Sequence, residues 1–485
     1  MKATSNWLEM HTRFRPDAPA LVDAGTGRAW TYRELWRESL GWAGRLRAEG
    51  VRPGDRVAVL AHNRGETLAI LFACAELGAI LLPLNWRLTA PELTWQLDHC
   101  GARVVLVDAA HAQALDRPTL SLEEGPHDPV GDLPGSPLDA PWMILYTSGS
   151  SGRPKGALLT HAQLHWNALN TTLACDLRPG DATLTFAPLF HTGGMNCLST
   201  PLLHRGGAVI LTPQFDAAGA LDLIARHRVT HLMGVPTIYQ MMADHPAFAE
   251  ADLSSVRDAL CGGAALSVSL LLRYQERNIP LRQGFGLTEV GPNCFSTPPD
   301  AVLRKKGSVG LPIHHIEARL VRPDGVVCGP GEAGELVLRG PVVCGGYWED
   351  PVATAKSIVD GWFHTGDLLE TDEDGYFYVR GRIKEMFISG GENVYPAEVE
   401  AAIQDCPGVA LAAVVGVPHA LWGEVGHAFL QAQPGADVDA DAVRAFLDGR
   451  LARYKIPKVY TLLPELPRTG SGKIDKQLLA RGGAA

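Results

Sequence analysis

The sequence predicts an α/β fold with a large N-terminal domain and a small α+β domain at the C-terminal end. Through about residue 300, short runs of Val, Ile and Leu alternate with helical patterns, which is typical of mostly parallel α/β subdomains. Residues 308–380 predict a small β subdomain, because their short Val-rich runs are separated by Gly, Pro and Asp turns. A separate pattern of strands and helices begins beyond residue 381.

The individual elements follow from these patterns. In the N-terminal domain we expect strands at residues 56–61, 79–84, 102–107, 142–145, 208–211 and 231–234, and helices at 32–49 and 215–227. The apolar stretch 68–84 is broken by Glu76, Gly78 and Pro83, so it predicts a buried helix running into a strand and not a membrane span. Residues 116–139 predict a long irregular connection. In the C-terminal domain we expect helices at 398–404 and 440–451 and strands at 411–417 and 428–433.

Composition narrows the class of protein. The 485 residues suggest about two to four folding units, and 46% apolar with 20% charged residues is ordinary for a globular protein. A formal net charge of −10 argues against nucleic acid as the main partner. Nine scattered cysteines without a Cys-x-x-Cys pair argue against a disulfide framework or a structural zinc site, and the N-terminus has no apolar signal-peptide core. We therefore expect a cytoplasmic protein without a transmembrane segment.

Residues 146–161 form the most informative stretch of the chain. Glycines permit positive φ and a close approach to a ligand, and backbone N–H groups, hydroxyls and a lysine together form an anion site. The spacing fits neither a Walker A loop nor a dinucleotide-binding turn, and a flexible surface loop is the alternative. Because the expected strand at 142–145 leads into it, we predict a polyphosphate-binding loop made of Thr147, Ser148, Gly149, Ser150, Ser151, Gly152 and Lys155.

Other segments combine small residues with polar groups. His191 stands beside a glycine pair and is either a packing residue or a functional one. The segment 262–264 offers close backbone approach, or is an ordinary tight turn. In the segment 284–289, small residues precede Thr288 and Glu289, which suit a phosphate donor and a magnesium ligand; a capped helix start is the alternative.

Four charged residues lie near the domain boundary and the C-terminus. Asp367 suits binding of both hydroxyls of a ribose, with a solvated turn as the alternative. Arg382 and Lys384 supply cations at the boundary. Lys473 stands on a glycine-rich loop, where a frayed tail is the alternative.

The order and spacing of these motifs, with the stretches 390–400 and 422–424, resemble the acyl-adenylate-forming superfamily of acyl-CoA synthetases, adenylation domains and beetle luciferases. Within it, the chain is most similar to bacterial fatty-acyl-CoA ligases, over about residues 5–478. The resemblance implies an acid–thiol ligase that uses ATP, Mg²⁺ and coenzyme A. Such an enzyme converts a carboxylic acid to acyl-AMP and pyrophosphate, and then transfers the acyl group to CoA with release of AMP.

The resemblance also implies roles in the first half-reaction. Lys473 would approach the α-phosphate and the acid, and Thr288 would contact the α-phosphate. Glu289 and Thr147 would bind Mg²⁺, while the 147–155 loop would hold the outer phosphates. Asp367 and Arg382 would hold the ribose. The adenine would be flanked by Gly262, Gly263, Ala264, Gly284, Phe285 and Gly286, with Phe285 standing where tyrosine is usual.

A mobile C-terminal domain is implied for the second half-reaction. The expected division is residues 1–381 for the AMP-binding domain, 382–386 for a hinge around Lys384, and 387–485 for the mobile domain. Rotation would remove Lys473 from the site and bring in a loop that lines a pantetheine tunnel. The expected tunnel residues are His191, Ser389, Gly390, Gly391 and Glu392.

An uncharged acyl tail is expected, because the sequence around His191 has no acidic residue to pair with a substrate amine and the candidate pocket is apolar. Its residues are Met195, Met233, Gly234, Val235, Pro236, Cys261 and Leu287. A medium- to long-chain fatty acid is the first expectation, and an aryl acid such as a benzoate, cinnamate or succinylbenzoate is the alternative. Transfer to a carrier protein, a homodimer and a peripheral membrane contact stay open, although no amphipathic basic helix supports the last.

Overall fold

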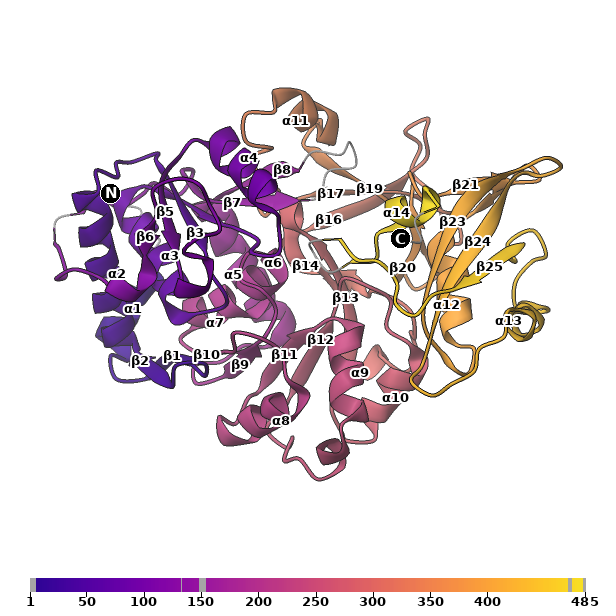
Figure 1. The fold of residues 1–485 in the computed structure, drawn as a ribbon, viewed down its shortest axis with the longest axis horizontal. Coiled ribbons are helices and arrows are strands. Elements are labelled where there is room, and N and C mark those ends of the chain that lie inside the picture. Colours follow the sequence, from indigo (N-terminus) through magenta and orange to yellow (C-terminus); the bar gives the residue numbers. More distant parts are fainter. Residues whose placement is uncertain (1–5, 132, 148–153, 470–472, 483–485) are drawn as a thin grey trace.

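The computed structural model describes residues 6–131, 133–147, 154–469 and 473–482. Figure 1 shows helices packed around two sheets that occupy the left and lower parts of the view, and a separate C-terminal sheet at the right. The predicted α/β class, with a large N-terminal domain and a smaller C-terminal domain, is confirmed.

The first sheet contains the predicted strands near the N-terminus. Its order is β6-β5-β3-β4-β7-β8, and all neighbours are parallel except β7 and β8. The strand order reverses at β3, because β4 follows on one side of it and β5 lies on the other. The bounds are β3 (Arg56–Leu60), β4 (Ile80–Pro83), β5 (Ala102–Val107), β6 (Leu120–Ser121), β7 (Pro141–Thr147) and β8 (Lys155–Thr160).

The second sheet has the order β15-β14-β13-β12-β11-β9-β10-β1-β2. Its centre is parallel, and antiparallel strands close both edges. The bounds are β1 (Pro19–Asp23), β2 (Arg28–Thr31), β9 (Ala182–Thr185), β10 (Ala208–Leu211), β11 (His231–Gly234), β12 (Asp258–Cys261), β13 (Leu281–Leu287), β14 (Gly291–Ser296) and β15 (Leu311–Pro312).

Helices cover the sheets and supply their cores. The apolar α3 (Gly65–Leu77) is buried almost entirely, as the all-round apolar pattern of 68–84 predicts, and Phe72 packs edge-on against Trp142 of β7. α2 begins with a capping box between Thr31 and Glu34. The other bounds are α1 (Trp7–Phe14), α2 (Tyr32–Ala48), α4 (Ala90–Cys100), α5 (His161–Cys175), α6 (Thr192–Gly194), α7 (Thr200–Arg205), α8 (Ala217–Arg226), α9 (Pro236–Asp244) and α10 (Val268–Gln275).

The predicted β subdomain is an antiparallel sheet, with β16, β17, β19 and β18 in order and β20 paired to β19. The bounds are β16 (Glu317–Val321), β17 (Gly334–Arg339), β18 (Ile358–Val359), β19 (Trp362–Thr371) and β20 (Phe377–Arg382). The helix α11 (Pro351–Ser357) within this region was not predicted; its start is capped by Asp350.

The C-terminal region has its own sheet and its own core. Phe387, Val399, Val414 and Leu430 belong to one buried cluster that contains no residue before Phe387. The C-terminal residues from Phe387 onward therefore have a buried core of their own. The exact limits of the domains stay a prediction. The bounds are β21 (Phe387–Ser389), β22 (Glu392–Val394), α12 (Pro396–Gln404), β23 (Val409–His419), β24 (Gly423–Ala432), α13 (Ala440–Leu447), β25 (Val459–Leu462) and α14 (Lys476–Ala480).

Two predicted elements differ from the structure. The connection at 116–139 is not wholly irregular, because it contains β6 and the 3₁₀ turn η2 (Leu122–Glu124), where Leu122 is buried. The helix predicted at 440–451 ends at Leu447, since Asp448 takes an extended conformation and Gly449 has a φ of +75°.

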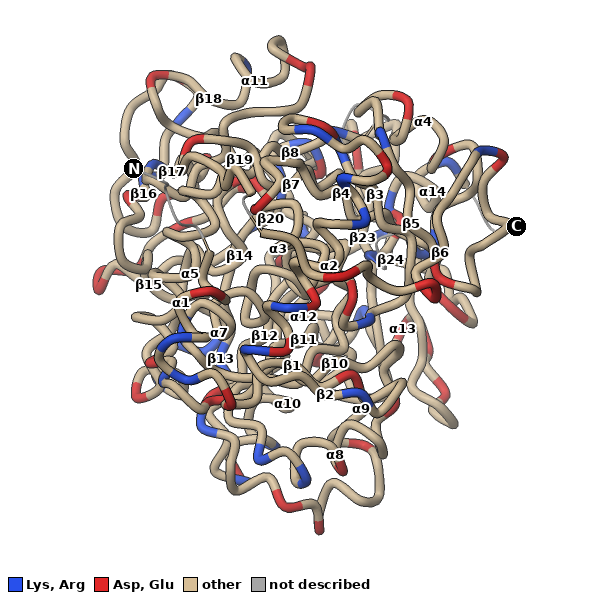
Figure 2. The backbone as a smooth tube through the Cα atoms, turned by 90° about the vertical axis from the view of Figure 1, so that its left-hand side faces the viewer, with Lys and Arg blue, Asp and Glu red and all other residues tan. Residues whose placement is uncertain are grey.

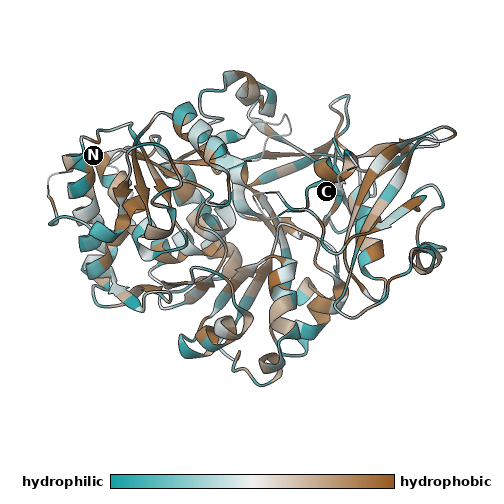
Figure 3. Cartoon of the chain, viewed as in Figure 1, coloured by the Kyte–Doolittle hydropathy of each residue, from teal (hydrophilic) through white to brown (hydrophobic). Residues whose placement is uncertain are grey.

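Charge and hydropathy are distributed as in a globular protein. Figure 2 shows basic and acidic residues interspersed along the chain, and Figure 3 shows brown, hydrophobic strands beneath helices with teal, hydrophilic positions. Among the described residues, no helix is long and apolar enough to cross a membrane.

A buried ion pair joins β12 to β13, and it generates a stability prediction. Asp258 accepts a 2.6 Å hydrogen bond from Nε of Arg282, and both side chains are buried. Asp258→Asn should lower the free energy of unfolding by about 3–5 kcal/mol, because the guanidinium loses its buried counter-charge. Thermal unfolding followed by circular dichroism measures the effect. Asp17→Asn, which breaks an exposed pair with Arg33, is the matched control; equal unfolding midpoints for the two variants would contradict the prediction.

Candidate active site

The predicted phosphate loop connects two paired strands. Thr147 ends β7 and Lys155 begins β8, and the two residues are register partners in the antiparallel ladder. The strand predicted at 142–145 is therefore confirmed as β7. Residues 148–152, which include the predicted Ser148, Gly149, Ser150, Ser151 and Gly152, lie outside the described residues. The structure thus places the two ends of the loop, Thr147 and Lys155.

Glu289 lies beside these two loop residues. It is buried in the 3₁₀ turn η5 (Thr288–Val290), and its Oε1 lies 3.4 Å from the donating hydroxyl of Thr147 and 3.0 Å from that of Tyr347. The ammonium of Lys155 lies 4.9 Å from the centre of the Tyr347 ring. A carboxylate and a hydroxyl in contact are the hard oxygen donors that Mg²⁺ prefers, so the predicted ligands Glu289 and Thr147 fit this ion.

Sequence reasoning missed Tyr347. Its segment extends the sheet edge, because Trp348 donates a 2.8 Å backbone hydrogen bond to Gly156 and Tyr347 forms a bridge with Ala157 of β8. The available signal was the pair Gly345-Gly346 in front of two aromatic residues, since glycines before a large side chain mark a close backbone approach.

Asp367 and Arg382 come together through strand pairing. They are partners in the β19–β20 ladder, and Nε of Arg382 lies 2.8 Å from Oδ1 of Asp367. Asp367 is 4% exposed, and its Oδ2 is buried without a hydrogen-bond partner. Burial raises the pKa of Asp367 to about 6, against the opposing attraction of Arg382 and Lys473. A buried carboxylate oxygen without a hydrogen-bond partner can accept a hydrogen bond from a ligand. The site therefore fits the hydroxyls of a ribose, which are hydrogen-bond donors.

Lys473 reaches the same place from the C-terminal domain. Burial among protein atoms and repulsion by Arg382 lower its pKa, while the carboxylates of Asp367 and Glu289 attract its charge. The side chain keeps access to water, so these interactions are screened and each is weak. The structure therefore brings Lys473 together with the predicted nucleotide-binding carboxylates.

His191 precedes α6 and adjoins Phe190, with ring centres 4.8 Å apart. Its Nε2 is buried without a partner. Burial, followed by the charges of Lys473 and Arg87, lowers the pKa of His191 to about 4. A neutral imidazole with a free nitrogen can orient a ligand but is a poor general acid at neutral pH.

The predicted adenine segments lie at the carboxyl ends of neighbouring strands of the second sheet. β11, β12 and β13 are parallel neighbours, and residues 262–264 follow the carboxyl end of β12 while 284–286 end β13. Gly286 is required here, because a Cβ atom would stand 2.1 Å from the carbonyl oxygen of Pro292. The side chain of Phe285 packs edge-on against Phe295.

The predicted acyl-pocket residues divide between the two faces of that sheet. Cys261 belongs to the core beneath α8, α9 and α10, whereas Met233 packs against the opposite cluster that contains Leu198 and Leu202. Met195 is fully buried and begins the π-helix η3 (Met195–Ser199). The remaining positions are partly exposed or at strand ends: Gly234, Val235, Pro236 and Leu287.

The predicted tunnel residues 389–392 form the β21–β22 hairpin. Gly390 and Gly391 have positive φ, and Gly390 donates a 2.9 Å hydrogen bond to the carbonyl of Trp422. The hydrogen bonds described for this hairpin stay within the C-terminal domain, and the C-terminal residue within electrostatic reach of His191 is Lys473. Lys384 lies in the turn that follows β20, at the predicted hinge.

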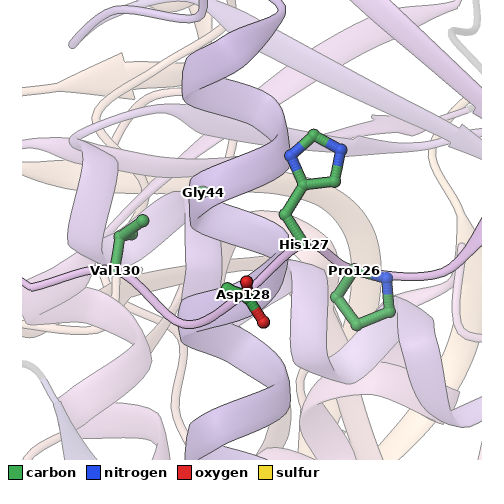
Figure 4. Close-up of a pocket in the computed structure, with 5 residues that line it drawn as sticks. All are labelled: Gly44, Pro126, His127, Asp128 and Val130. Atoms are coloured by element: carbon green, nitrogen blue, oxygen red, sulfur yellow. The ribbon is translucent and has the colours of Figure 1, made fainter.

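A shallow hollow lies away from these residues. Figure 4 shows it between α2 and the connection that crosses it, lined by Gly44, Pro126, His127, Asp128 and Val130. None of the predicted site residues lines it, so the chemistry does not reside there.

Comparison with known proteins agrees with this geometry. The sequence profile of the AMP-binding enzyme family matches residues 8–348, and that of the AMP-binding enzyme C-terminal domain matches 398–473. A feruloyl-CoA synthase of Amycolatopsis sp is 45% identical over 97% of each chain. A long-chain-fatty-acid–CoA ligase of Mycobacterium tuberculosis is 36% identical over 99% of this chain and 98% of its own.

Solved structures agree as well. The o-succinylbenzoate CoA synthetase of Bacillus subtilis, in complex with its acyl-adenylate intermediate, superimposes with a TM-score of 0.90 at 32% identity and covers 98% of this chain and 97% of its own. The chain therefore belongs to the AMP-binding enzyme family, and it is an acid–thiol ligase that uses ATP, Mg²⁺ and coenzyme A.

Proposed function

We propose that this ligase activates an aryl acid of the hydroxycinnamate type, and that it does so through the residues gathered around Asp367. The observation that carries the adenylation chemistry is the unpaired, buried Oδ2 of Asp367 beside Arg382 and Lys473. The feruloyl-CoA synthase, at 45% identity, supports an aryl acid, as does the succinylbenzoate enzyme. The fatty acid that the sequence favoured stays untested.

The burial of the pocket candidates also supports a compact acid. A long alkyl chain needs an open channel, but Met195 is fully buried. Met233 packs closely on the α6 turn, since a Cβ atom on Gly193 would lie 2.9 Å from its Cε. A flat aromatic ring fits against such side chains more easily than a flexible chain does.

In the proposed mechanism the chain supplies positive charge and alignment, and no general base is needed. The acid is already ionised, and its carboxylate attacks the α-phosphorus of ATP, which is itself surrounded by negative oxygens. The bond from the α-phosphorus to the bridging oxygen of the β-phosphate breaks, and pyrophosphate leaves. Lys155 and Lys473 would offset this charge, as in phosphoryl transfer generally. Mg²⁺, when bound at Glu289 and Thr147, would supply further stabilisation of phosphate charge.

The second half-reaction transfers the acyl group to the CoA thiol, with AMP leaving. We propose that the C-terminal domain turns at Lys384, withdraws Lys473 and presents the hairpin of residues 389–392. Neutral His191 would orient the acyl group. Lys476, which lies 2.6 Å from Glu385 and 2.8 Å from Glu400, would keep the end of the hinge attached to the moving domain.

Substrate choice is tested by AMP release with ATP, Mg²⁺ and CoA over a panel of acids. The panel contains hydroxycinnamates, benzoates, aryl acetates and fatty acids of increasing length. We expect kcat/KM to be highest for a hydroxycinnamate. A maximum of kcat/KM on a fatty acid would contradict the aryl proposal but not the assignment as an acid–thiol ligase. Adenylate formation without CoA turnover would indicate a carrier protein as acceptor.

Lys473→Ala tests the assignment of the mobile lysine. Adenylate formation should fall about 100- to 1000-fold, because one preorganised cation of the transition state is lost. Thioester formation from synthetic acyl-AMP should change little, since Lys473 would have left the site by then. Single-turnover kinetics, measured separately for adenylate formation and for thioester formation, distinguish the two effects. Lys458→Ala, an exposed lysine of the same domain, is the matched control; equal losses in both halves would refute the role.

The raised pKa of Asp367 predicts a pH dependence of nucleoside binding. The carboxylate is ionised only above about pH 6, so its ability to accept hydroxyl hydrogens disappears as the pH falls through that value. Adenosine, which carries no titrating phosphate, should lose affinity by up to about tenfold per pH unit below it. Competition binding at several pH values measures this. Asp367→Asn should bind adenosine weakly and independently of pH; a pH-dependent variant would point to another group.

A further inference from the structure

A cluster of two histidines and an aspartate lies in the first sheet, apart from the nucleotide residues. His62, Asp108 and His111 each offer a ligand atom, and these atoms lie within 4.8 Å of one another. It is the one group of three such residues found in the described part of the chain. None of the three belongs to the predicted adenylation machinery.

The cluster occupies a place where α/β sheets bind ligands. His62 follows the carboxyl end of β3, and Asp108 follows the carboxyl end of β5. β3 and β5 are parallel neighbours, and the strand order reverses between them. Consecutive connections leave toward opposite faces at such a point, which opens a crevice at the carboxyl edge. The two faces of the sheet are covered by different hydrophobic cores, since Val59 and Leu60, which are adjacent in β3, belong to different buried clusters.

The backbone fixes the carboxylate at the centre of this group. Oδ2 of Asp108 accepts a 3.0 Å hydrogen bond from the backbone of His62, and Oδ1 accepts a 3.1 Å bond from that of His111. Asp108 is buried, and the two histidines are partly buried. Oδ2 also lies near Nδ1 of His62 and Oδ1 near Nδ1 of His111, so each oxygen contacts one of the two imidazole rings, whose centres are 4.9 Å apart.

The distances are close to those of a metal site. Metal–ligand bonds of about 2.0–2.2 Å in a tetrahedral site place donor atoms about 3.3–3.5 Å apart. Nδ1 of His62 lies 3.4 Å from Oδ2 of Asp108. Nδ1 of His111 lies 2.5 Å from Oδ1, which is a hydrogen bond, and would retreat by about 1 Å to become a ligand. The ligand atoms of all three residues lie within 4.8 Å of one another, so movements of about 1 Å in the two imidazoles would bring them to the separations of a metal site.

We propose that His62, Asp108 and His111 bind a divalent transition-metal ion of the Zn²⁺ class, with water in the remaining position. Two imidazoles and a carboxylate select Zn²⁺, Co²⁺ or Ni²⁺, whereas Mg²⁺ requires oxygen donors such as Glu289 and Thr147. The ion would join the ends of β3 and β5. It would also fix the ring of Trp86, which lies 4.6 Å from that of His62 and 6.4 Å from that of Phe190.

The test measures the metal that tag-free protein binds in the absence of nucleotide, after resident metal has been removed with a chelator. Co²⁺ is titrated into this protein and followed by its visible absorption. Zn²⁺ is supplied separately, and the amount that stays bound through gel filtration is measured by mass spectrometry. Wild type should retain one equivalent of Zn²⁺ that the His62→Asn, His111→Asn double variant does not retain. Each single variant should bind Co²⁺ more than about tenfold more weakly, since even an outer-shell loss costs about 10–100-fold.

Matched controls separate the site from general effects. His314→Asn removes an exposed histidine elsewhere and should leave Zn²⁺ content unchanged. Far-ultraviolet circular dichroism establishes that the double variant is folded, and excess Mg²⁺ should not displace the bound Co²⁺. Equal Zn²⁺ content in wild type and the folded double variant would overturn the proposal, as would wild type that retains none.

Discussion

The burial of one carboxylate, that of Asp367, is the constraint on which the active site depends. Taking a charge out of water is costly, and here a single guanidinium compensates one oxygen while the other stays unpaired. The protein maintains this arrangement because Asp367 and Arg382 are fixed opposite each other by a strand ladder. Hydroxyls of a ligand would offset the remaining desolvation cost by donating hydrogen bonds to the unpaired oxygen. The acceptor for the nucleoside is therefore already in place before the ligand binds.

In the proposed mechanism, the same pair would link nucleotide binding to movement of the C-terminal domain. Arg382 is both the last residue of β20 and the first residue of the predicted hinge. Lys473 faces both members of the pair, so Arg382 repels it while Asp367 attracts it. Because Lys473 also keeps contact with water, its attraction to the site is screened. An ammonium held this loosely can reach the site for one step and leave for the next, as the proposed rotation requires.

Sequence patterns predicted what depends on local periodicity, and missed what depends on contacts across the chain. The strands β3, β4, β5 and β7 of the first sheet and the buried α3 follow from runs of apolar residues. The two-residue β6 and the contact of Tyr347 with Glu289 have no local signature, because strand partners create them. Cys261 is expected in the acyl pocket because it is apolar and precedes a glycine pair, but it ends β12 and the alternation of side chains along that strand turns it into the core. The sequence did not predict a strand at 258–261, so it could not assign Cys261 to a face of the sheet.

The predicted Mg²⁺ ligands and the proposed site for a Zn²⁺-class ion both lie at carboxyl ends of strands. Thr147 at the end of β7 and Glu289 just beyond β13 bring oxygen donors together from both sheets, whereas His62, Asp108 and His111 come from the first sheet alone. The two places are not isolated. Ring contacts run from His62 to Trp86, from Trp86 to Phe190, and from Phe190 to His191, at 4.6, 6.4 and 4.8 Å. Close-packed rings transmit displacement, so an ion that fixes His62 would restrict the imidazole proposed to orient the acyl group.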